Sequence, residues 1–435
     1  AAGDPASPDV VAFLGWEWTQ VGATPDTHYG HKNVVLLESD PTRVPVRPVA
    51  AGGENLRAIR ETRLGPLGVA LPLLDLANRQ AYYDFARFQR ETGEAPLCGA
   101  DPNDDDTCIE VADSPSELFA ALDRWGGEAL VIPHGTSWGA TTPPGASWSA
   151  ELRPGGPDPA RQPLIEVYSG HGNSEAYRDW AGTNPDGSCP PPRDDYVPIC
   201  WQAGEIIKAR CAAAGEPAAI CEKRAGEARA FAAAAGRNAV LTVPGQRGRD
   251  WSDAEQCRDC FLAPFGHRPR KSAQAALASR GEDGAAFRFG LIASSDNHSA
   301  RPGTGYKEFG RLGMTDERGL APGRLRDLLA TEPSDPAFRS VPVTPEAPGI
   351  GIANSERQAA FWTTGGLVAV HATGRSRGAI WDALESRNVY ATSGDRILLW
   401  FDLLNGPEGA QPMGSEAPGM REAPRFRVSA AGAFE

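Results

Sequence analysis

A carboxylate and an imidazole lie two positions apart near the middle of the chain. The apolar run 290–293 leads through two serines to Asp296 and His298, and Arg301 follows three positions later. In a strand, residues i and i+2 project to the same side, and α/β domains bind ligands beyond the carboxyl ends of their parallel strands. The pair is therefore predicted to hold a divalent metal, with Arg301 binding an oxyanion through two hydrogen bonds.

Two further apolar runs end in residues that bind metals. Residues 10–14 lead to Glu17, which lies between two tryptophans, and residues 129–133 end at His134. A buried glutamate without a partner is costly, so Glu17 predicts either a metal or an arginine partner. For His134 we favour a metal ligand over a histidine of a surface loop.

Three more polar residues lie in or near expected strands. His31 precedes an apolar segment at 34–37, and we favour it over His28 as a ligand, although either residue suits an exposed loop. His171 follows the expected strand 163–169 in a glycine-flanked turn, where it is predicted to bind metal or contact substrate. Glu166 lies inside that strand and is equally consistent with a structural role.

The candidate ligands form one nitrogen and oxygen donor set. Four of the seven histidines of the chain belong to it, and no cysteine is required. Such donors suit Zn²⁺, Mn²⁺ or Fe. Two or more such ions can clamp a phosphoryl group and lower the pKa of a bridging water. The predicted ligands are Glu17, His31, His134, His171, Asp296 and His298.

Composition narrows the class of protein. The 435 residues are 41% hydrophobic and carry a net charge of −13 without a basic stripe, so nucleic-acid binding is not expected. A small anionic substrate would need a local positive centre, which bound metals can provide. No segment reaches the roughly 18 apolar residues of a membrane span. The sequence does not indicate an oligomeric state.

The eight cysteines fall largely in polar, loop-rich segments. We predict four local disulfides and an oxidising compartment, which means a periplasmic or secreted protein. A zinc site or reduced thiols remain the alternative. The predicted pairs are Cys98 with Cys108, Cys189 with Cys200, Cys211 with Cys221, and Cys257 with Cys260.

Periodicity and capping signals predict helices that separate these strands. Residues 79–92 are amphipathic, and Ser114 to Glu117 form a capping box that begins a helix ending near Trp125. An alanine-rich helix is expected near 217–235. We predict an α/β domain over residues 1–404 with an insertion at 182–262, followed by the start of a β-rich segment at 405–435.

Several of these motifs resemble those of the polymerase and histidinol phosphatase (PHP) superfamily. They are Gly-Trp-Glu17-Trp, Val-Ile-Pro-His134, Leu-Ile-Glu-Val-Tyr and Ser-Ser-Asp296-Asn-His298. The sequence is more similar to a large, mostly secreted and functionally uncharacterised bacterial branch, which carries phrases like Gly30-His31-Lys-Asn and Tyr168-Ser-Gly-His171. The likeness runs from about residue 10 to 410.

The resemblance implies a distorted seven-stranded (β/α) barrel with two or three divalent ions and hydrolysis of a phosphoester. In it, Glu17 matches the bridging glutamate, His134 the histidine after the middle strand, and Asp296 with His298 the final pair. His31 is a plausible fourth histidine, whereas His171 belongs to the branch. Arg301, and His171 as a second function, are expected to stabilise developing charge.

The chain departs from the superfamily at its start. An opening His-x-His motif and a further strand-end histidine do not occur here. We therefore expect the sequence to be truncated at both ends. The alternatives are a secreted binding or scaffold protein on a decayed hydrolase fold, and a hydrolase that acts on a non-phosphate ester or a sulfate.

Overall fold

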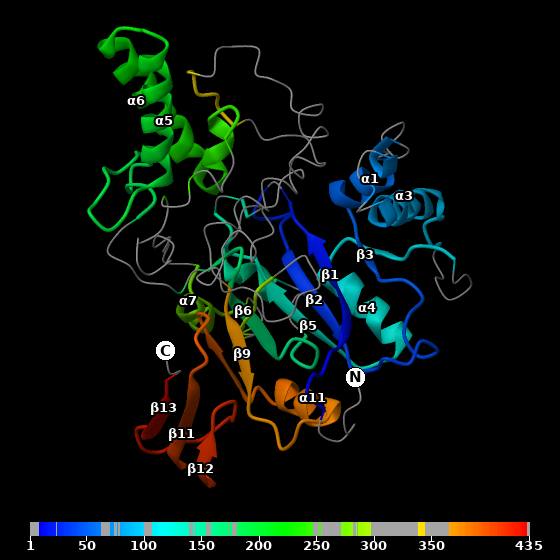
Figure 1. The fold of residues 1–435 in the computed structure, drawn as a ribbon. Coiled ribbons are helices and arrows are strands. Elements are labelled where there is room, and N and C mark those ends of the chain that lie inside the picture. The colour runs from blue at the N-terminus through cyan, green and yellow to red at the C-terminus, as the bar shows by residue number, and fades with distance from the viewer. Residues whose placement is uncertain are drawn as a thin grey trace.

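The structure of the protein is a computed structural model with mixed helices and sheets (Figure 1). No closed barrel is present among the residues that it describes, so the predicted (β/α) barrel stays a prediction. The described residues are 8–22, 24–61, 70–73, 76, 79–99, 107–138, 142–143, 145–153, 158–173, 175, 181–246, 251, 254, 271–281, 284, 286–296, 338–343 and 365–432.

Three adjoining sheets form the centre of the molecule. The first is antiparallel, in the order β1 (Leu14–Gln20), β2 (Gly30–Leu36), β5 (Ala129–His134). The second has the order β7 (Gly172–Asn173), β6 (Leu164–Ser169), β8 (Gly290–Ala293), and β6 and β8 are parallel. The third pairs β9 (Leu367–Val370) with β10 (Val389–Thr392).

Main-chain hydrogen bonds join these sheets at their edges. The Val131 N–H of β5 donates to the carbonyl of Arg161, just before β6, at 2.7 Å. The Gly366 N–H, just before β9, donates to the carbonyl of Ser294, just after β8, at 2.8 Å. The central strands therefore lie in one continuous row, with β5 next to β6 and β8 next to the β9–β10 pair.

Alternation of side chains along these strands divides them between two faces. On one face an apolar cluster contains Leu130, Ile132, Leu164, Ile292, Trp381 and Val389, with Phe13, Val35 and Leu37 packed against it. We call this the inner cluster. The alternate residues Trp18, Val34, Leu36 and Val131 pack on the opposite face against α4 (Pro115–Trp125). Both faces of the first sheet are therefore covered.

Local sequence signals account for α4 and for the helix that begins at Arg79. Ser114 Oγ accepts from the Glu117 N–H at 3.4 Å, which confirms Ser114 as the N-cap, while Glu117 Oε2 accepts from the Asp113 N–H at 2.6 Å, one residue before the N–H that a capping box uses. The helix predicted over 79–92 is α3 (Arg79–Glu94). It packs with α1 (Glu54–Glu61).

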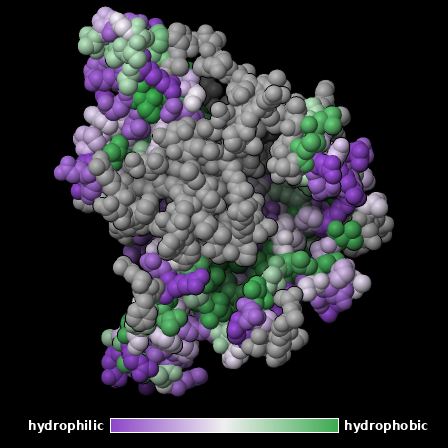
Figure 2. Space-filling view, in the orientation of Figure 1, coloured by the Kyte–Doolittle hydropathy of each residue, from purple (hydrophilic) through white to green (hydrophobic). Residues whose placement is uncertain are grey.

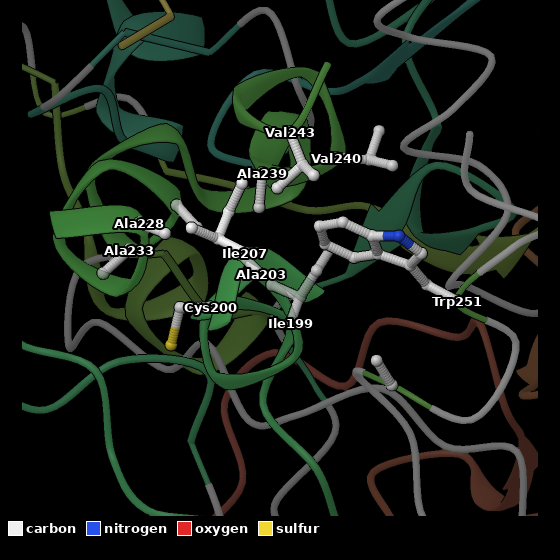
Figure 3. Packing of buried hydrophobic residues seen from close by; sticks show 12 residues of the cluster. Ile199, Cys200, Ala203, Ile207, Ala228, Ala233, Ala239, Val240, Val243 and Trp251 are labelled. Carbon is white, nitrogen blue, oxygen red and sulfur yellow. The ribbon is translucent and has the colours of Figure 1, made fainter. Parts of the chain in front are cut away.

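The helical hairpin of α5 (Ile199–Ala213) and α6 (Ala218–Ala235) projects from the sheets at the upper left of Figure 1. It is followed by a 3-10 helix, Gly236–Thr242. These elements share an apolar cluster of their own, in which Trp251 extends its ring toward the packed helices (Figure 3). The cluster lies within the insertion predicted at 182–262.

Three of the four predicted disulfides are present: Cys98–Cys108, Cys189–Cys200 and Cys211–Cys221. Cys257 and Cys260 lie outside the described residues. Among the helices that the structure describes, none is long and apolar enough to cross a membrane.

The C-terminal region forms a small antiparallel sheet beyond α11 (Arg377–Glu385). Its order is β12 (Gly409–Pro412), β11 (Leu398–Gly406), β13 (Phe426–Ala431). β11 crosses the division predicted between residues 404 and 405. In Figure 2, apolar surface gathers between this sheet, at the lower left, and the central strands, whereas the helical hairpin at the upper left shows hydrophilic and hydrophobic residues side by side.

Removing the Cys211–Cys221 disulfide by the double change C211A/C221A is expected to destabilise the hairpin of α5 and α6. The bond closes a loop of 10 residues, and its loss should cost about 2–3 kcal/mol by releasing the unfolded chain. Hydrogen exchange of α5 and α6 measures this cost. Equal loss of protection in β1, β2 and β5 would contradict a local effect.

Candidate metal centre

Glu17, His31 and His134 converge because β2 runs opposite to its two neighbours. In the register, Thr19 lies beside His31, and His31 lies beside His134. The start of β2 therefore meets the ends of β1 and β5. The sequence argument from parallel strands does not apply to this sheet, but the antiparallel register brings the same three side chains together. One ligand atom from each lies within 4.8 Å of the others.

The three side chains are in direct or near contact. His31 Nδ1 and Glu17 Oε1 lie 2.5 Å apart, and Thr19 Oγ1 donates a second hydrogen bond to Glu17 Oε1 at 2.7 Å. His134 Nε2 lies 3.7 Å from Glu17 Oε1. Glu17 Oε1 is therefore near both imidazoles, whose ring centroids are 5.3 Å apart.

Asp296 reaches the same cluster from the segment that follows β8. Its Oδ2 atom lies 3.9 Å from His134 Nε2 and 4.0 Å from His171 Nε2. His171 Nε2 also contacts the Asp296 carbonyl oxygen at 2.9 Å, so its N–H donates to the main chain in this arrangement. His171 therefore holds Asp296 in place, and its predicted roles as metal ligand and charge stabiliser stay predictions.

His134 is the least satisfied of these groups. Its side chain is only 2% exposed, and neither ring nitrogen has a hydrogen-bond partner among the described residues. Buried polar groups in native proteins are almost always hydrogen bonded, and an ion is one explanation for an exception. A neutral imidazole with a free lone pair is also the form that binds a metal.

Electrostatics favour the same protonation states. Burial lowers the pKa of His134 and outweighs the raising effect of Asp296 and Glu17, so this imidazole is neutral near pH 7. Burial raises the pKa of Glu17, but the hydrogen bond to His31 and the charges of His31 and His134 outweigh it, and the pKa falls to about 2. A neutral imidazole beside an ionised carboxylate fits a divalent transition metal.

The remaining predicted site residues are His298 and Arg301, which lie outside the described residues. Conversely, the structure adds residues that the sequence argument did not assign to the site. Glu166 and Ser294 lie beside Asp296, and Thr19 lies beside Glu17. The sequence feature that could have assigned Glu166 to the site is its position two residues after Leu164, which belongs to the inner cluster. That spacing places Glu166 on the same strand face as His134.

A buried ion pair supports both histidine segments from behind. Lys32 Nζ donates to Glu151 Oε1 at 2.9 Å and to the Tyr29 carbonyl at 2.8 Å. Thr136 Oγ1 donates to the same Glu151 oxygen at 2.8 Å. Lys32 follows His31, and Thr136 lies two residues after His134. One carboxylate therefore ties the segments of His31 and His134 to the 3-10 helix Trp148–Leu152.

Comparison with known proteins assigns no activity to this arrangement. Residues 269–431 match the model of a family described as a protein of unknown function (DUF3604). The match includes β8 and Asp296 but not β1, β2 or β5. No curated protein and no solved structure matches the chain.

The change Lys32→Met is expected to destabilise the protein by about 3–5 kcal/mol, because it leaves the buried Glu151 carboxylate without its cation. Denaturant unfolding measures the loss. The double change K32M/E151M is the control and should recover part of it, since no charge then remains buried. A single variant as stable as the parent would contradict this role for the ion pair.

Acidification is expected to destabilise the protein partly through His28. Burial lowers its pKa from 6.5 to about 4, and its Nε2 atom contacts the Gly135 carbonyl at 3.4 Å. Between pH 6.5 and about pH 4, His28 is therefore protonated in the unfolded chain but largely neutral in the folded protein. The free energy of unfolding falls as the pH drops through this range. At pH 5 the free energy of unfolding is lower than at pH 7.5 by about 2 kcal/mol from this residue.

The change His28→Gln should flatten this dependence relative to the parent. Urea midpoints at pH 7.5 and pH 5 give the comparison. The histidines of the metal cluster remain in both proteins, so only the difference between the two proteins reports on His28. Equal pH dependence in both would show that His28 does not contribute.

Proposed function

We propose that this protein is a metal-dependent hydrolase, most consistent with a phosphoesterase of the PHP type. The observation that carries the proposal is the convergence of Glu17, His31 and His134. The His134 imidazole is buried and has no hydrogen-bond partner among the described residues. Asp296 adds a second carboxylate beside them. The predicted barrel and the fourth disulfide belong to the same proposal.

Glu17, His31, His134 and Asp296 would hold the metal. When bound, Zn²⁺, Mn²⁺ or Fe supplies Lewis acidity toward a phosphoryl oxygen and lowers the pKa of water. Binding must displace the proton shared by His31 and Glu17, so metal affinity should fall in acid. The proposal includes two or three ions if the additional N-terminal ligands of the superfamily are present in this protein.

Substrate recognition is assigned to Arg301 and His171. In the proposal, Arg301 pairs with an anionic phosphoester, and His171 secures Asp296 and stabilises developing charge. The net charge of −13 would repel such a substrate unless the metals supply a positive centre. The three disulfides fit a periplasmic or secreted protein.

Metal analysis of the purified protein tests the proposal directly. We expect bound or reloadable Mn²⁺, Zn²⁺ or Fe, and hydrolysis of members of a panel of phosphomonoesters and phosphodiesters. The changes His134→Gln and Asp296→Asn should each weaken metal binding by more than about 100-fold and abolish turnover, because each removes a proposed ligand.

The same panel separates the alternatives. Metal binding with cleavage of sulfate or carboxylic esters, but not phosphoesters, would keep the metal centre and replace the substrate class. Metal binding without any turnover would favour a scaffold on a decayed hydrolase fold. Absence of binding to any of these metals, or a metal affinity that His134→Gln leaves unchanged, would overturn the proposal.

A further inference from the structure

Glu166 lies at the boundary between the inner cluster and the metal centre. It pairs with Ile292 of β8, and the register of β6 and β8 shifts immediately after it, so that Tyr168 lies beside Ala293. The strand therefore has one extra residue, Val167, at this point. Such bulges often occur next to active sites, where they change the direction of a side chain.

A short relay of hydrogen bonds connects Glu166 to Asp296. The hydroxyl of Ser294 donates to Glu166 Oε2 at 2.6 Å. The same Ser294 oxygen accepts from the Asp296 N–H at 3.2 Å. Ser294 has a single hydroxyl proton, so its bond to Glu166 leaves the oxygen lone pairs available for Asp296. Removing Glu166 would leave the direction of this hydroxyl undefined.

Asp296 needs such support because its backbone conformation is uncommon. Its φ angle is 45°, in the left-handed region that residues other than glycine rarely adopt. The relay holds its N–H, and His171 holds its carbonyl. Ser294 is itself fixed through its main chain, because its N–H donates to Tyr168 at 3.1 Å and its carbonyl accepts from Gly366 at 2.8 Å.

Glu166 is also too polar for a purely structural position on this face. Its side chain is almost completely buried, with 1% of the residue exposed, and Oε1 has no hydrogen-bond partner among the described residues. An apolar residue would extend the inner cluster from Leu164 without the cost of burying a carboxyl group. The position makes sense if the carboxyl group acts on a neighbour.

We infer that Glu166 and Ser294 are positioning residues of the metal centre, which hold the Asp296 carboxylate in the orientation that binds the metal. This inference rests on the proposed function, and it adds two residues to the site. Partners behind a ligand set its orientation, and changing them typically weakens metal affinity about 10–100-fold. Glu166 does not contact substrate in this assignment.

The test measures the dissociation constant for Mn²⁺ by competition with a chromogenic chelator. The variants are Ser294→Ala, Glu166→Leu and the double change. Each single change should weaken binding about 10–100-fold, and the double change should weaken it no more than the stronger single change, because both interrupt one relay. Ser294→Thr keeps the hydroxyl and should restore binding.

Val167→Ala provides the matched control. Val167 is the neighbouring residue on β6, is buried, and packs on the opposite face against Trp148 and Phe287. This change should lower the melting temperature and leave the Mn²⁺ dissociation constant unchanged. Should Glu166→Leu not fold, Ser294→Ala removes a single oxygen and carries the test with Ser294→Thr.

The outcomes separate this inference from the proposed function. If His134→Gln abolishes Mn²⁺ binding while Ser294→Ala and Glu166→Leu bind as the parent does, the positioning assignment fails and the metal centre stands. If the effects of the two single changes multiply in the double variant, the relay is also refuted. If the parent itself binds no metal, the proposed function fails.

Discussion

Carboxyl groups beside an apolar cluster are costly to bury unless positive charge or hydrogen bonds compensate them, and the centre of this molecule depends on that compensation. Glu17 is stabilised by His31 and His134, which lower its pKa to about 2 despite its burial. Glu166 has one hydroxyl donor, and burial with the nearby charge of Asp296 raises its pKa well above the usual range. Bound metal ions would compensate this cluster directly.

The buried cation Lys32 does not compensate these carboxyl groups. Lys32 lies on β2 next to His31, but strand alternation directs it to the opposite face, where it pairs with Glu151. The sheet therefore separates two kinds of polar burial. One face has the Lys32–Glu151 ion pair, and the other has the imidazoles and carboxylates of Glu17, His31, His134 and Asp296. The second group is the one that we propose holds a metal.

The helical hairpin is organised independently of the metal centre. Small residues such as Ala203, Ala228 and Ala232 let α5 and α6 approach closely, and the disulfide Cys211–Cys221 joins the two helices. Their cluster includes none of the residues of the inner cluster.

The sequence by itself determined what depends on neighbours along the chain: the N-cap of α4, the period-two alternation of the strands, the three short-range disulfides and the metal-binding residue types. It did not determine strand direction, because alternation is identical in parallel and antiparallel strands. Only the tertiary structure placed the start of β2 against the ends of β1 and β5, and so joined His31 to Glu17 and His134. Likewise, Glu166 became part of the site only through its contact with Ser294, 128 residues away, which no local pattern encodes.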